Sequence, residues 1–204
     1  MFSMSYSEFS TMHLYAHSAA ESIDSSRMTD FEQFAHLSGR DASISPDGLS
    51  LTKTSDSYTF GGAVADRWIC PRTDCAYLAV RLVRGDGIGM FLGVTAREAV
   101  DTDTALLIDP TSRMYRCFDS FAWPCRRQWG VPTDQCRRRE GDLIGLLVKD
   151  GRLYVFVNNE PLCRGPMAAD LPERVRFCAE VYFNDDCFQI EPAAGLPDLS
   201  GLEL

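Results

Sequence analysis

The sequence predicts an all-β protein, a two-sheet antiparallel β-sandwich that follows a short N-terminal, possibly helical, extension. Turn signals separate at least eight short apolar strand candidates, the spacing typical of a sandwich. No long stretch repeats its apolar residues with the 3.6-residue period of an amphipathic helix. Hydrophobic residues make up 45% of the chain and charged residues 24%, which is ordinary for a globular domain with a buried core.

The strand candidates begin at residue 42. Residues 42–54 predict two short strands around the Ser45-Pro46-Asp47-Gly48 turn, where proline fixes φ and glycine tolerates positive φ. Residues 104–118 predict a strand, an Asp-Pro-Thr-Ser turn and a second strand. The other strands are expected at 75–83, 84–95 after a glycine-rich turn, 142–148, 152–159, 174–183 and 187–192. One domain over residues 31–193 is therefore expected, between an extension (1–30) and a tail (194–204).

The charge balance restricts the function classes. The net charge is −9 and the isoelectric point is near 4.8, whereas proteins that bind nucleic acid or anionic membranes in general carry an excess of positive charge. No apolar run reaches the ~18 residues of a membrane span. The first residues lack the basic start and apolar core of a secretory signal, so we expect a cytoplasmic protein.

The sequence shows no catalytic or metal-binding motif. Its eight cysteines contain no C-x-x-C pair, and the three histidines (His13, His17 and His36) all precede the first cysteine. We therefore expect no metal, no cofactor and no disulfide framework, with the cysteines acting as small buried thiols. There is also no G-x-S-x-G or H-E-x-x-H motif, so we expect a protein that is not an enzyme. A glycosidase-like carboxylate pair on a sandwich remains an alternative, since the sequence does not place such pairs in space.

Three segments in order resemble the SPRY (B30.2-like) domain family. They are "LGVTAREAV" (92–100), "ALLIDPTSRMYRC" (105–117) and "GDLIGLLVKDGRLYVFVNNEPL" (141–162). The last contains a G-D-x-I-G element and an F-x-x-N element, and residues 169–190 are similar to the closing segment of that family. The Neuralized-type repeat, a relative, begins with a segment similar to residues 34–54. The resemblance implies a concanavalin-like SPRY sandwich that binds a peptide or a protein through loops at one end.

The third segment also has physical meaning by itself. Leu153, Val155 and Val157 share one face of a strand while Tyr154 and Phe156 share the other, so both faces are apolar and a central strand is expected. Asn158-Asn159 stands where the SPRY family usually has Asn-Gly, and because asparagine tolerates positive φ, the turn is expected to survive.

Residues 116–142 are the main candidate for a binding loop, since they concentrate aromatic and arginine side chains in an acidic chain. Arg/Trp clusters also suit RNA, which the net charge argues against, and the same residues could simply cover the sandwich edge. A second candidate is residues 56–72. The predicted partner-binding residues are Tyr58, Arg67, Trp68, Arg116, Trp123, Arg126, Arg127 and Trp129. The expected function is a non-catalytic protein-interaction module; the alternatives are a carbohydrate-binding or hydrolytic enzyme and a structural subunit of a larger assembly.

Overall fold

The computed structural model describes residues 32–98, 104–119, 121–123, 127–128 and 137–203. Within them, regular structure consists of strands and the short 3-10 helix η2 (Leu106–Ile108). The strands are β1 (Phe34–Ser38), β2 (Ala42–Ile44), β3 (Ser50–Lys53), β4 (Gly61–Ala65), β5 (Ala76–Arg84), β6 (Phe91–Thr95), β7 (Arg113–Arg116), β8 (Phe121–Trp123), β9 (Arg127–Gln128), β10 (Leu143–Lys149), β11 (Arg152–Val157), β12 (Glu160–Pro161), β13 (Arg176–Val181) and β14 (Cys187–Ile190). Among these residues no helix is long and apolar enough to cross a membrane.

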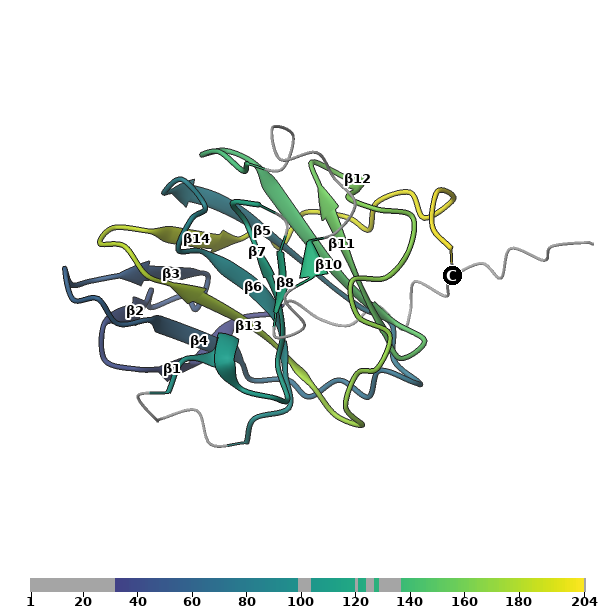
Figure 1. Cartoon of the computed structure of the whole chain (residues 1–204), viewed down its shortest axis with the longest axis horizontal. Coiled ribbons are helices and arrows are strands. Elements are labelled where there is room, and N and C mark those ends of the chain that lie inside the picture. The colour runs from purple at the N-terminus through teal and green to yellow at the C-terminus, as the bar shows by residue number, and fades with distance from the viewer. Residues whose placement is uncertain (1–31, 99–103, 120, 124–126, 129–136, 204) are drawn as a thin grey trace, which may run out of the picture.

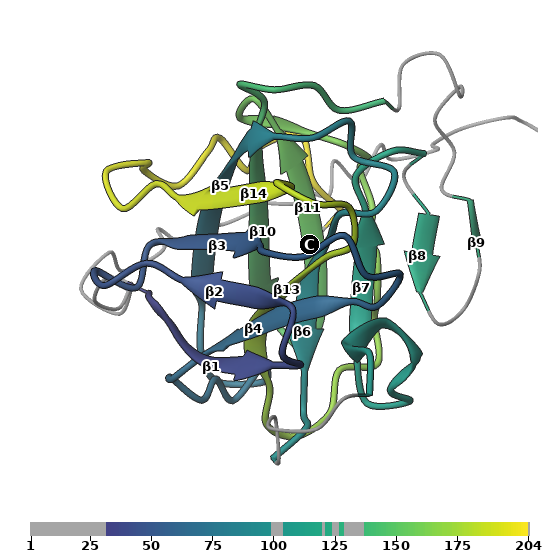
Figure 2. The same ribbon diagram turned by 90° about the vertical axis from the view of Figure 1, so that its left-hand side faces the viewer.

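The strands form two antiparallel sheets of seven strands each (Figure 1). The order in the first sheet is β1-β4-β13-β6-β7-β8-β9, and in the second it is β12-β11-β10-β5-β14-β3-β2. Figure 2 shows β8 and β9 at the edge of the first sheet, on the side away from β1. The prediction of an all-β, two-sheet antiparallel sandwich is therefore confirmed.

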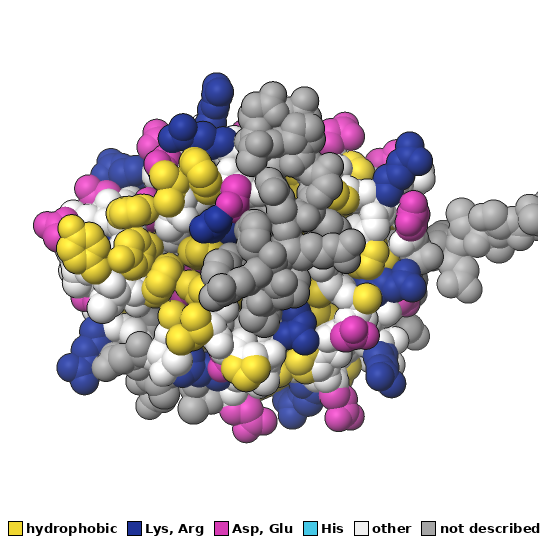
Figure 3. Space-filling view, in the orientation of Figure 1, with side chains coloured by type: hydrophobic (Ala, Val, Ile, Leu, Met, Phe, Trp, Pro, Cys, Tyr) yellow, Lys and Arg dark blue, Asp and Glu magenta, His cyan; other side chains and the backbone are white. Residues whose placement is uncertain are grey.

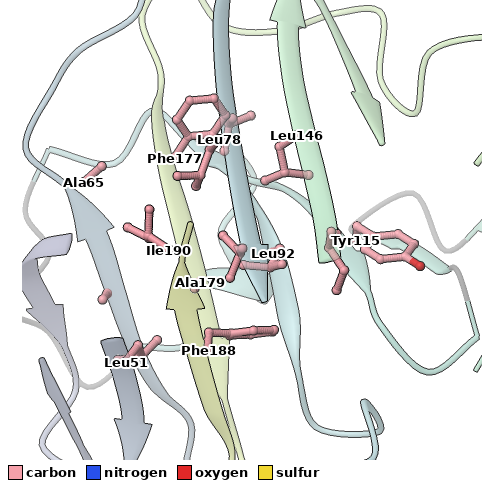
Figure 4. Close-up of a cluster of buried hydrophobic side chains, with 14 of the residues drawn as sticks. Leu51, Ala65, Leu78, Leu92, Tyr115, Leu146, Phe177, Ala179, Phe188 and Ile190 are labelled. Carbon is pink, nitrogen blue, oxygen red and sulfur yellow. The ribbon is translucent and has the colours of Figure 1, made fainter. Parts of the chain in front are cut away.

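Side chains from both sheets meet in one core (Figure 4). Leu92, Phe177 and Ala179 point inward from the first sheet, while Leu78 and Leu146 come from the second, and all are at most 2% exposed. Alternate residues along each strand supply these contacts, because successive side chains of a strand point to opposite faces. This burial provides most of the stabilisation that holds the two sheets together.

Each sheet also buries part of its outer face. On the first sheet, Phe91, Met114 and Cys178 lie under Leu106 and Leu107 of η2. On the second sheet, Leu147, Tyr154 and Phe156 lie under three leucines of the C-terminal segment, Leu196, Leu199 and Leu202. The fold is therefore a sandwich with a partial third layer on each side.

Three sequence predictions about individual elements were wrong. The strand expected at the start of 104–118 is the 3-10 helix η2, whose leucines pack on a sheet instead of pairing within one. The loop-like segment 56–72 contains β4, a fully buried strand between β1 and β13. Residues 116–142, expected to be a loop, contain the backbone of β8 and β9.

The strand β11 is an interior strand with two buried faces, as its apolar pattern predicted. It is second from the edge, between β10 and the two-residue β12. Its second apolar face is buried because the C-terminal segment covers it, not because further strands surround it. The pattern thus correctly predicted burial on both sides, but the covering element lies about 40 residues further along the chain.

The predicted turns are confirmed. Gly48 has φ +72° in the turn between β2 and β3, and Asp150 and Gly151 have φ +51° and +75° between β10 and β11. Asn158 and Asn159 adopt φ +51° and +70°, so this pair does replace the usual Asn-Gly.

The cysteines follow the expectation only in part. Cys117 and Cys178 are buried as predicted, and burial raises the pKa of both thiols, whereas Cys70 is exposed. Cys70, Cys75, Cys117, Cys178 and Cys187 are free thiols.

Candidate partner-binding site

The strands leave two groups of loops at opposite ends of the sandwich. The Tyr58 end contains the loop between β3 and β4, residues 85–90 before β6, and the turn between β13 and β14. The Trp68 end contains residues 66–75 before β5 and the β10–β11 turn. Strand registers fix this division, because antiparallel neighbours bring alternate connections to the same end.

The loop that carries Tyr58 is held from beneath by Asp41. Its carboxylate accepts hydrogen bonds from the hydroxyls of Ser55 (2.9 Å), Ser57 (2.8 Å) and Thr59. Bonds from Thr59, Ser57 and Ser55 lower the pKa of Asp41 to about 2, so it remains a carboxylate throughout the neutral range. The fully buried Lys53 adds bonds from Nζ to Ser55 (2.9 Å) and Ser57 (3.1 Å). Every second side chain of the loop therefore points inward.

Tyr58 points the other way and is 86% exposed. It belongs to a contiguous group of four rings, Tyr58, Phe60, Tyr182 and Phe183, which we call the aromatic strip. The ring centroids of Tyr58 and Tyr182 are 6.5 Å apart, those of Phe60 and Tyr182 are 4.7 Å apart, and those of Tyr182 and Phe183 are 5.0 Å apart. Figure 3 shows hydrophobic side chains gathered at this end of the molecule.

The second half of the strip is fixed by the buried Asp186. Its Oδ2 accepts a hydrogen bond from the backbone N–H of Phe183 (2.9 Å), which closes the turn between β13 and β14. Burial raises the pKa of Asp186 to about 6, and the nearby carboxylate of Asp86 contributes to this shift. Phe183, at 43% exposure, is thus presented by a turn with a defined geometry.

Next to the aromatic strip lie one exposed apolar side chain and a pair of charged side chains. A Cβ on Gly89 would contact Tyr182 and Phe183, which places the loop of the 38% exposed Ile88 directly beside the strip. On the other side of that loop, the guanidinium of Arg137 lies 5.3 Å from the ring centre of Phe118 and 3.6 Å from the carboxylate of Asp86. The result is an apolar centre with a rim of paired charges, as in protein–protein interfaces.

The structure separates the predicted site residues. Arg116 pairs with Phe91, whose ring lies 5.8 Å from that of Phe60, so Arg116 belongs to the Tyr58 end together with Tyr58. Arg67 and Trp68 lie at the opposite end and do not join this site. Arg67 contacts Glu32 (3.5 Å between Nη1 and Oε1).

Trp68 makes structural contacts within the fold, and its predicted binding role stays a prediction. Its ring lies 4.7 Å from the guanidinium carbon of Arg174 and 4.4 Å from that of Arg176. Arg176 is only 4% exposed, and the neighbouring Ile69 and Val175 form a β-bridge. Trp68 therefore fastens the segment before β5 to the segment before β13 through cation–π contacts.

The remaining predicted residues lie partly outside the described chain. Arg126 and Trp129 are outside the described residues. The backbone of Trp123 pairs with Met114, and that of Arg127 pairs with Ala122, in the β7–β8–β9 edge. A binding role for these four side chains stays a prediction.

Sequence reasoning missed Phe60, Tyr182 and Phe183. Tyr182 and Phe183 stood at the end of a predicted strand, where aromatic residues usually belong to the core. A signal was present, because "VYFNDDC" places two aromatic residues directly before the turn residues Asn184 and Asp185. The contact with Tyr58, more than 120 residues earlier, is a property of the folded chain alone.

Comparison with known proteins shows the same fold. The SPRY domain of human HERC1 superposes with a TM-score of 0.59 at 13% identity, over 81% of this chain and 99% of that domain. Another human SPRY domain gives 0.61 at 16% identity, over 79% and 100%. The Drosophila melanogaster Neuralized NHR1 domain gives 0.52 at 12% identity, over 80% and 99%. No protein-family model matches the chain, and no curated protein matches it in sequence.

Proposed function

We propose that this chain is a non-catalytic protein-interaction module that binds a peptide or protein partner through the aromatic strip at the Tyr58 end. The observation that carries the proposal is the 86% exposure of Tyr58 on a loop that is otherwise firmly bonded. Because the Tyr58 ring buries little apolar area, it contributes little to the stability of the folded state. The same ring supplies contact area and a hydroxyl to a partner, which is why tyrosine is enriched at binding hot spots.

The support of the loop strengthens this proposal. The three hydroxyls on Asp41 and the bond from Phe183 to Asp186 hold both halves of the strip before any partner arrives. A preformed surface loses less conformational entropy on binding, so more of the contact energy contributes to affinity. The similarity to SPRY and Neuralized domains supplies a matching rigid sandwich, although a shared fold does not fix a function.

A site-specific crosslinking experiment tests the proposal. A photo-crosslinking phenylalanine derivative is placed at Tyr58 in one variant and at Ile108 in another. Ile108 is a matched control because it is 61% exposed and lies beside Arg113, Met167 and Ala168, none of which belongs to the aromatic strip. The partner crosslinked from position 58 but not from 108 is then purified and titrated against the double variant Tyr58→Ala/Phe183→Ala.

The expected loss is at least about 2 kcal/mol, or roughly 30-fold in Kd, because two hot-spot rings are removed together. Stability should change little, and circular dichroism of the double variant checks that it is folded. Equal affinity of the folded double variant and the wild type, or equal crosslinking from both positions, would show that the partner binds elsewhere.

A further inference from the structure

The outer face of the second sheet carries an apolar surface that no strand covers. Leu147 of β10 and Tyr154 and Phe156 of β11 point away from the core between the sheets, and all three are at most 1% exposed. Tyr77 of β5 extends this surface, with its ring 6.3 Å from that of Phe156 in an edge-to-face contact. These four side chains form what we call the outer groove.

The chain's own C-terminal segment occupies the outer groove. Leu196, Leu199 and Leu202 recur at every third residue and pack on Leu147, Tyr154 and Phe156. In Figure 1 these last residues, drawn in yellow, run from the end of β14 past β10 and β11. The contact resembles that of a bound peptide. An irregular segment packs a repeated leucine against a surface that is mostly aromatic.

Few backbone hydrogen bonds fasten this segment to the domain. The N–H of Glu203 donates to the carbonyl of Arg164 (2.8 Å), and the hydroxyl of Tyr154 donates to the carbonyl of Glu203 (3.3 Å). Nη1 of Arg152 in turn donates to the Tyr154 hydroxyl at 3.4 Å. The strands beneath are bonded along both edges, so the segment can detach at a lower free energy than the sheet can open.

Two features beside the segment remain unsatisfied: one buried hydroxyl and one hollow. The Tyr77 hydroxyl is buried without a hydrogen-bond partner in the described part of the chain, a costly arrangement for a polar group. Burial accordingly raises the pKa of Tyr77 to about 12. Where the segment begins, a hollow of about 550 Å³ lies between residues 193–197 and Arg81, Leu143, Asn159 and Glu191. A Cβ on Gly195 would meet no atom within 4 Å, so this side of the segment faces open space.

We propose that the outer groove is a second peptide-binding site, which residues 196–203 occupy in cis and which accepts an equivalent segment of a partner protein in trans. The ligand is a segment with leucines three residues apart, a turn between the second and third leucine, and a following acidic residue, the pattern of "LPDLSGLE" itself. The backbone of Glu203 is anchored by the carbonyl of Arg164 and by the Tyr154 hydroxyl, which in turn is bonded to Arg152. This proposal is independent of the Tyr58 end, because the two surfaces share no residue.

The experiment uses the full chain and a fluorescein-labelled peptide of residues 196–203. In the wild type, residues 196–203 of the chain itself compete with the labelled peptide for the groove. Only molecules whose segment has detached can bind the peptide, so the apparent affinity is lower than that of an open groove. The variant Leu199→Asp/Leu202→Asp releases the segment, and we expect it to bind the peptide roughly tenfold or more tightly than the wild type does. A peptide with the same two substitutions should bind neither protein, and Gly195→Ala, which meets open space, should behave as the wild type.

Failure of the folded double variant to bind the peptide more tightly than the wild type would overturn the proposal. A second measurement covers the case in which that variant does not fold. In the wild type, hydrogen exchange at the Glu203 amide should be at least roughly tenfold faster than at the amides of β10, because the segment opens locally. Exchange of both only through global unfolding would show that the segment is a fixed part of the fold.

Discussion

Asn158 has two tasks in the turn that follows β11. Its backbone takes the left-handed conformation with φ +51°, and its side-chain Oδ1 accepts the N–H of Leu143 (2.9 Å) while Nδ2 donates to Asp142 (3.0 Å). Asn159 has φ +70° and is exposed. The sequence predicted that two asparagines can form this turn. Which of the two side chains bonds to β10 depends on the register between β10 and β11.

This asymmetry predicts opposite outcomes at neighbouring positions. Asn158→Gly should lower the free energy of unfolding by about 1–2 kcal/mol, because two hydrogen bonds are lost while the backbone gains little. Asn159→Gly should change it by no more than about 0.5 kcal/mol, since glycine adopts positive φ without strain. Urea unfolding of the two single variants measures both values, and a larger loss at Asn159 would contradict the assignment.

Gly93 shows how closely two strands of the first sheet approach. A Cβ at this position would overlap the carbonyl oxygen of Arg113 and would lie 2.8 Å from Cα of Met114, both in the backbone of the paired β7. Since backbone cannot move aside as a side chain does, Gly93→Ala should destabilise the domain by about 2–4 kcal/mol. Thermal and urea unfolding, with Gly195→Ala as the neutral control, check this prediction.

Among the elements, η2 depends on a carboxylate that the sequence does not single out. Both oxygens of the buried Glu180 accept backbone N–H groups at the start of this helix, from Leu106 and, at 3.0 Å, from Leu107. Burial raises the pKa of Glu180 to about 7, although the two backbone bonds lower it. A glutamate in a strand usually predicts a solvent-exposed position. The burial of Glu180 is explained only by the position of η2 over β13, where the backbone N–H groups of η2 bind its carboxylate.

The raised pKa predicts a specific pH dependence. In the unfolded chain a glutamate titrates near 4.3, so between about pH 7 and pH 4.3 the folded state binds a proton that the unfolded state lacks. Glu180 therefore makes the domain more stable as the pH falls through this window, and its ionised form costs stability above pH 7. The total change is on the order of 3–4 kcal/mol, the equivalent of roughly two and a half pKa units.

Unfolding in urea at pH 8, 7, 6 and 5 measures this effect. Relative to Glu180→Gln, which does not titrate, the wild type should gain stability at each step downward. Asp186, whose pKa is raised to about 6, contributes in the same direction, and because it is present in both proteins it cancels from the difference. A difference between wild type and Glu180→Gln that stays constant with pH would contradict the raised pKa.

The elements that the sequence predicted correctly are those whose signals are local. The hairpin from β10 to β11 combines apolar runs with Asp150-Gly151, and the β2–β3 hairpin has its Pro-Asp-Gly turn. The sequence around η2 is equally apolar, but its leucines pack on the outer face of the first sheet instead of pairing within a sheet. An apolar pattern predicts that a segment is buried. It does not predict whether the segment forms a strand of a sheet or packs against the face of one.

At the scale of the whole molecule, the candidate site could be predicted only in part. Tyr58 and Arg116 lie at one end of the sandwich, whereas Arg67 and Trp68 lie at the other end of β4, and partner binding by all four stays a prediction. The five residues of β4 span about 16 Å, enough to make the two ends separate surfaces. Tyr58 and Trp68 are close in sequence but not in space, because β4 runs between them from one end of the sandwich to the other.

This separation predicts independent behaviour of the two ends. Tyr58→Ala should change the free energy of unfolding by no more than about 0.5 kcal/mol, since the ring is largely exposed. Trp68→Ala should cost about 1–3 kcal/mol, because Arg174 and the buried Arg176 both lose their ring contact. The double variant should equal the sum within about 0.5 kcal/mol, and a larger coupling would contradict the separation.

The strand order of the two sheets has a consequence for how the protein acquires its structure. β4 pairs with β13, and β5 pairs with β14, so strands separated by roughly half the chain are neighbours in both sheets. During synthesis β4 and β5 must wait for partners made about 100 residues later, with their apolar faces uncovered in the meantime. Closing such long loops precedes the gain from pairing, so folding should be slow, on the scale of milliseconds to seconds typical of sandwiches.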